Sequence, residues 1–162
     1  MADITNEITS IRDFVAPHIT GVKFHLQNMP EAYKAGELAI DFATGKGVSE
    51  TGVSYRLDRT FQIVYFGTSG ADCLRKMAPL EQQFNHAQMI HIKGTTRYLR
   101  IGSFSLSQSF KTETTGVHAI IGMLEVNLRE LRPQPDSEKI ENVIVDVIDT
   151  ETQAPCNKNL KE

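Results

Sequence analysis

The sequence predicts a small α+β domain, in which a mostly antiparallel sheet packs against two main helices. Its length of 162 residues fits one domain. In residues 4–19 and 70–86, apolar side chains recur at steps of three and four, which is the helical period. Several other segments alternate apolar and polar residues, which is typical of half-buried strands. A C-terminal extension with one further strand completes the predicted fold.

The first helix carries a single apolar stripe, so we expect it to pack against the sheet. Its members include Ile8, Ile11 and Val15. We expect Thr5 or Asn6 to cap the start of this helix, because short polar side chains accept hydrogen bonds from its free N–H groups. Proline cannot continue the helical ladder, so the helix ends near Pro17.

Strands are predicted on both sides of a glycine-rich stretch. Short strands occupy residues 21–27 and 38–43, and residues 44–52 (TGKGVSETG) then form a hairpin loop. The strand with the clearest alternation covers residues 55–66, with one apolar face and one wet or partner-covered face. Arg59 interrupts the apolar face, so its guanidinium needs a partner or a route to water.

The second helix and the strands after it follow from the same patterns. Pro79 predicts either a kink in the helix or its division into two short helices. Residues 89–92 and 97–110 flank a turn at 93–96 and so predict a hairpin. In the second strand of this hairpin, one face is predicted to hold Tyr98, Arg100, Gly102, Phe104, Leu106 and Phe110.

The last part of the chain divides into a strand, a linker and an arm. Residues 117–131 are apolar on both faces at first and on one face later, which predicts a strand that emerges from the core. Two prolines make residues 132–136 a linker, and residues 140–148 (IENVIVDVI) then favour a strand. We therefore divide the chain into a domain of residues 1–131 and an arm of residues 132–162.

Charge and composition narrow the classes of function. The net charge is −3. Proteins that bind nucleic acid through its phosphates usually have an excess of basic residues or a stripe of them on one face. No apolar run reaches the length of a membrane span, so no membrane partner is expected. Cys73 and Cys156 form no metal-binding pair, and we expect both thiols to be reduced in the cytosol.

The motifs that would indicate an enzyme are absent from the sequence. Gly45-Lys46-Gly47 is followed by Val48 and a strand, whereas a phosphate-binding loop needs Ser or Thr and a helix. The five histidines form no metal-ligand spacing. We therefore predict no catalytic residue, no cofactor and no metal, and a protein that is not an enzyme.

The arm favours assembly. Val143, Ile144, Val145 and Val147 place β-branched residues on both faces of a strand, which would risk aggregation if it were left free in water. This strand must therefore join a sheet, either of its own subunit or of a neighbour. The sequence leaves both alternatives open.

Three segments carry a resemblance to a known family. They are YRLDRTFQIVYFGTSGADCLRKMAPLEQQF, RYLRIGSFSLSQSF and HAIIGMLEVNLREL, which occur in this order along the chain. With the helix before them, they resemble the tail terminator (tail-completion) proteins of long-tailed bacteriophages and phage-derived tail-like particles. The resemblance covers residues 4–131 and rests on the pattern of helices and strands.

The resemblance implies a structural virion protein. Members of this family form a ring, usually a homohexamer, at the head-proximal end of the tail tube, after assembly in the host cytoplasm. The ring stops tube polymerisation and provides the surface to which the head attaches. The implied partners are further copies of the chain, the tail tube protein, and neck, connector or sheath proteins, with DNA only as passing cargo. The family carries no cofactor and no catalytic residues.

Contacts are expected at two loops, on the wet face of the long strand, and in the arm. The resemblance points to the loop at 44–52 and the hairpin near 93–97. The predicted interface residues are Lys46, Val48, Arg56, Asp58, Lys93, Arg97, Val143, Val145 and Val147.

Two other functions remain open from the sequence. The first is a head–tail stopper, neck or tube protein. The second is a small ligand-binding or enzymatic domain that uses Asp41, Asp58 or His91 in a pocket.

Overall fold

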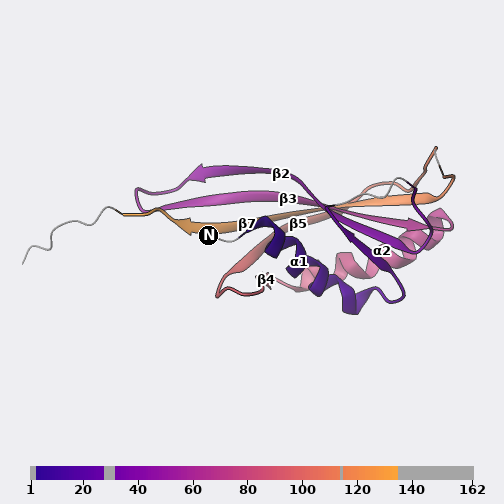
Figure 1. The fold of residues 1–162 in the computed structure, drawn as a ribbon, viewed down its shortest axis with the longest axis horizontal. Helices are drawn as coiled ribbons and strands as arrows, with labels where there is room; N and C mark the ends of the chain where they lie inside the picture. The colour runs from indigo at the N-terminus through magenta and orange to yellow at the C-terminus, as the bar shows by residue number, and fades with distance from the viewer. Residues whose placement is uncertain (1–2, 28–31, 114, 135–162) are drawn as a thin grey trace, which may run out of the picture.

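The computed structural model describes residues 3–27, 32–113 and 115–134 (Figure 1). These residues form an α+β fold, as predicted, with a mostly antiparallel sheet in the order β1-β2-β3-β7-β5-β4, and with β6 paired to β7. Only β1 and β2 pair in parallel among the described strands. The elements are α1 (Ile4–Val15), η1 (Ala16–His18), β1 (Lys23–Leu26), β2 (Glu37–Ser49), β3 (Ser54–Gly67), α2 (Gly70–His86), β4 (Met89–His91), β5 (Tyr98–Leu106), β6 (Phe110–Lys111) and β7 (His118–Leu131).

Both helices lie on the same side of the sheet (Figure 1), and the main core lies between them and the strands. The stripe predicted on α1 is buried there, at Ile8, Ile11 and Val15. The predicted cap is wrong, because Asp3 caps α1 by accepting a hydrogen bond from the N–H of Thr5 at 3.3 Å. The helix also stops at Val15, and a short 3₁₀ turn takes the chain through Pro17.

Helix α2 has the predicted bounds and buries Cys73, Met77, Leu80 and Phe84. It continues through Pro79, so the predicted alternative of two short helices is wrong. Pro79 lies on the exposed side of the helix, where water can satisfy the carbonyl that loses its N–H partner.

The glycine-rich stretch is a strand and not the predicted loop. β2 extends to Ser49, and only residues 50–53 form the turn to β3. Gly45 and Gly47 pair with Arg59 and Leu57 of β3, so the ladder between the strands holds the glycines in extended conformation. The register shifts between Phe42 and Thr44, where the unpaired extra residue forms a bulge.

A second bulge changes the predicted face of β5. The register against β7 shifts between Ile101 and Ser103, which leaves Gly102 as the extra residue. Leu99 is therefore buried before the bulge and Phe104 after it, although they have opposite parities. The predicted apolar face was wrong before the bulge, where Tyr98 is 51% exposed.

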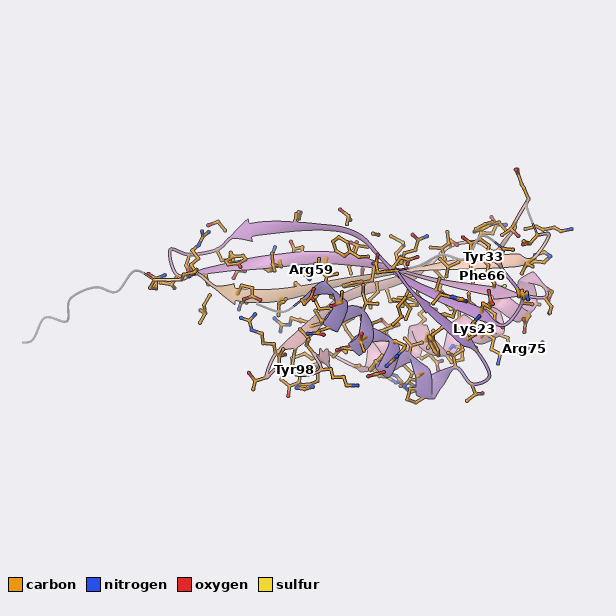
Figure 2. All side chains as sticks on the ribbon, viewed as in Figure 1. Lys23, Tyr33, Arg59, Phe66, Arg75 and Tyr98 are labelled. Atoms are coloured by element: carbon orange, nitrogen blue, oxygen red, sulfur yellow. The ribbon has the colours of Figure 1, made fainter. Side chains whose placement is uncertain are left out.

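β7 emerges from the core as predicted. Its first half is buried on both faces, because Ile120 faces the helices while Ala119 packs with Val64 and Phe66 on the opposite face. Tyr33 covers this second cluster with its ring stacked 4.0 Å from that of Phe66 (Figure 2). The second half alternates between buried and exposed residues.

The arm lies outside the described residues. The predicted strand at 140–148 and the division of the chain after residue 131 therefore stay predictions.

Candidate assembly surface

Three strands extend beyond the helices to the turn at residues 50–53 (Figure 1). We call residues 44–49, 54–60 and 125–131 the ribbon. Antiparallel pairing places register partners on the same face of a sheet. One face of the ribbon therefore continues the surface that packs against α1 and α2, and we call it the helix face. The other is the open face.

Four of the predicted interface residues lie together on the open face. Lys46 pairs with Asp58, and Val48 pairs with Arg56. Arg56 and Asp58 have the opposite parity to Phe61 of β3, which packs in the core, so they point to the open face. Lys46 and Val48 are their register partners and lie on the same face. The structure therefore brings them into one patch, although none was expected to pair with another.

β7 extends this patch with two residues that were not among the predicted interface residues. Asn127 pairs with Asp58, and Arg129 pairs with Arg56. Only the register of β7 against β3 reveals this proximity, because the residues are far apart in the sequence.

A network of charges connects the open face to the turn. The Arg56 guanidinium donates to both carboxylate oxygens of Asp58, with Nε–Oδ1 at 2.7 Å and Nη2–Oδ2 at 3.2 Å. The Oε1 atom of Glu50 lies 3.5 Å from Nη1 of Arg56, and its Oε2 atom lies 2.9 Å from Nε of Arg129. The hydrogen bonds from Arg56 lower the pKa of Asp58, so its carboxylate stays charged and is a weak base.

The other predicted interface residues lie elsewhere. Lys93 is in the β4–β5 turn, with its ammonium 3.5 Å from Asp13 of α1. Arg97 precedes β5 and forms a close ion pair with Glu130, which lies on the helix face of β7. The predicted contacts at Val143, Val145 and Val147 lie outside the described residues.

Arg59 has the partner that its position on the apolar face requires. Glu7 of α1 lies fully buried, and the Arg59 Nη1 atom is 2.5 Å from its Oε1 atom. Figure 2 shows Arg59 at the base of the ribbon beside the start of α1. Burial raises the pKa of Glu7, and the positive charge of Arg59 opposes this effect.

The open face has a hollow of about 410 Å³ at the base of the ribbon. Lys46, Asp58, Thr60, Glu125 and Asn127 are among the residues that line it. Lys46 and the two carboxylates give this hollow charges of both signs.

The residues of the enzymatic alternative do not come together. Asp41 pairs with Gln62 and lies four positions of β3 from Asp58, which is roughly 13 Å at the usual rise of a strand. His91 is in β4 at the opposite edge of the sheet and lines a different hollow. Burial raises the pKa of Asp41, whereas the pKa of Asp58 is lowered.

Neither metal ligands nor a membrane span were found in the described part of the chain. Its His, Cys, Asp and Glu residues form no group of three that could hold a metal ion. Neither described helix is both long enough and apolar enough to cross a membrane.

No family model and no curated protein matches the chain. One similar solved structure, of a protein known only by a sequence identifier, is 14% identical with a TM-score of 0.49, and the match covers 84% of this chain and 100% of the other. A chain of the virion of a native gene transfer agent particle is 12% identical with a TM-score of 0.35, over 74% of this chain and 84% of the other. At these values, neither likeness assigns a function.

Proposed function

We propose that the chain is a structural subunit of a ring at the head-proximal end of a phage-type tail tube. The ring ends tube polymerisation and provides the surface to which the head or neck attaches. The observation that carries this proposal is the ribbon, whose open face presents Lys46, Val48, Arg56 and Asp58 as one patch. The resemblance of residues 4–131 to tail terminators supports the same function.

The ribbon is suited to protein contacts. It projects from a domain whose core is filled on the helix face, so a partner can cover the open face without disturbing that core. Its exposed ion pairs add little to the stability of the subunit, which leaves their charges free to select a partner.

The proposed ring needs two unlike contact patches on each subunit. When the contacting patches on a subunit differ, each copy binds the next, and the assembly closes if the rotation between copies allows it. Six copies are expected from the resemblance. One side of the ring then complements the tube, and the other side binds neck, connector or sheath proteins but no further tube subunits.

DNA takes part only as cargo that passes through the ring. The net charge of −3 suits a channel that does not retain phosphates. In this proposal the chain catalyses no reaction and holds no cofactor, and Asp58 serves as a charged contact held by Arg56.

Mass photometry of the purified chain, alone and with isolated tail tubes, tests this proposal. We expect a discrete ring of about six copies, formed either in solution or only on the tubes. A strictly monomeric protein without affinity for tubes would refute it.

The nearest alternative is a head–tail stopper. Deletion of a terminator gene gives overlong tails, whereas deletion of a stopper gene gives tails of normal length to which heads do not join. Electron microscopy of the deletion therefore separates the two functions.

A further inference from the structure

The outer edge of β2 is open along most of the ribbon. β1 pairs with β2 only from Glu37 to Ile40. Beyond that point, β3 is the only strand of the described chain that pairs with β2. The main-chain groups on the outer side of residues 42–49 can therefore pair with an added strand. We call this stretch the β2 edge.

A hollow of about 200 Å³ lies beside the β2 edge, on the helix face, and Lys46 and Arg59 line it together with apolar residues. Ile4, Phe42 and Leu57 provide its apolar surface. Gly45 and Gly47 also line it, and the absence of their side chains leaves the hollow open. A strand added to the edge would point every second side chain toward this hollow, so it must carry apolar residues at alternate positions.

The chain contains a segment of this kind. In residues 140–148, Val143, Val145 and Val147 have one parity, and Ile144 and Ile148 have the other. Either parity can therefore supply apolar side chains to the hollow, and the segment is long enough to pair with the whole β2 edge.

The path of the chain favours the edge of a neighbouring subunit. The backbone N–H of Arg132 donates to the carbonyl of Val53 at 2.8 Å, and its Nη2 donates to the Ser49 hydroxyl at 2.7 Å. β7 therefore leaves the domain at the tip of the ribbon. Pro133 fixes its own φ and disfavours a helical conformation at Arg132, which favours a path outward from the tip.

We propose that the β2 edge binds residues 140–148 of an adjacent copy as an added strand, with apolar side chains of that strand in the hollow. This inference rests on the self-assembly in the proposed function and identifies one of its contacts. Repeated around the ring, the contact joins each subunit to the next through unlike surfaces.

Disulfide crosslinking of the full-length chain tests this contact. Cys156 is replaced by Ser, and the buried Cys73 stays in place. One tagged population carries Val48→Cys, and a second carries a single cysteine at one position from 140 to 148. After mixing and oxidation, we expect crosslinks between the two populations at every second position of the arm.

Gly47→Val gives a test that needs no change in the arm. A Cβ atom at Gly47 would lie 3.8 Å from the Leu57 Cδ2 atom, which is an ordinary contact, and the extended backbone of a strand suits a β-branched residue. The added group fills the hollow, and we expect roughly a tenfold or larger loss of crosslinking. Gly52→Ala is the control, because its Cβ atom meets nothing within 4 Å.

The outcomes separate this inference from the proposed function. Rings that form while crosslinks between the two populations are absent overturn the inference and leave the ring intact. If crosslinks form between chains but the protein never forms rings, even on tubes, the proposed function is overturned. The contact between the arm and the β2 edge then still holds.

Discussion

Glu7 of α1 and Arg59 of β3 form a buried ion pair at the point where the ribbon leaves the core. Glu7 is fully buried and the Arg59 side chain is 11% exposed. The pair joins the first helix to the strand that forms the centre of the ribbon. It therefore fixes the helix relative to the surface proposed for assembly.

The first prediction concerns the energy of this pair. Glu7→Leu and Arg59→Met should each lower the free energy of unfolding by about 3–5 kcal/mol, because each leaves the other charge buried without its partner. The double variant should lose much less free energy of unfolding than the sum of the two single losses. Urea denaturation of the four proteins measures this coupling, and additive losses would show that the two side chains act independently.

The second prediction concerns close packing between β7 and β5. A Cβ atom at Gly122 would lie 2.6 Å from Cζ of Phe104 and 3.2 Å from Cε of Met77. Gly122→Ala should therefore lower the free energy of unfolding by about 1–3 kcal/mol, since the core must shift to admit a methyl group. Gly52→Ala, measured in the same denaturant series, should lower the free energy of unfolding far less. Equal effects of the two substitutions would contradict the packing described here.

The third prediction concerns alkaline pH. Burial and the nearby charge of Asp72 raise the pKa of Tyr65 from 10.0 to about 12. The folded state therefore favours the protonated phenol, so its contribution to stability is complete below pH 10 and is lost as the pH rises toward 12. Tyr65→Phe should remove this part of the decline. Titration by ultraviolet absorbance provides the check, and ionisation of Tyr65 at its ordinary pKa in the folded protein would contradict it.

The fourth prediction separates binding from folding on the open face. Arg56→Ala combined with Arg129→Ala should weaken binding to tail tubes by about tenfold or more, because both charges belong to the proposed contact. The free energy of unfolding should change little, as is usual for substitutions at surface positions. Arg75→Ala is the matched control, since Arg75 is an exposed arginine on α2 (Figure 2). Equal binding by all three proteins would exclude the open face from the contact.

Much of the fold could be predicted because apolar periodicity reports which side of an element is buried. The bounds of α2 and the emergence of β7 from the core followed directly from that pattern. The need of Arg59 for a partner was also visible, because a charge stood on an apolar face. That Glu7 supplies the partner depends on how α1 packs, which local sequence does not encode.

The errors occurred where pairing between strands outweighs local preference. Gly45 and Gly47 favour a loop by themselves, yet the ladder with β3 holds them in a strand. The bulge at Gly102 reversed the parity of β5, and its one local signal was the isolated glycine inside the strand pattern. The open face could be predicted only in part, because Arg129 joins Arg56 through the register of β7.

The most direct measurement of the central claim is tail length in the particle that encodes this chain. Electron microscopy of tails produced without the gene should show overlong tubes of variable length, and the wild-type gene should restore a single length. Tails of normal length without the gene would contradict a role in ending tube polymerisation.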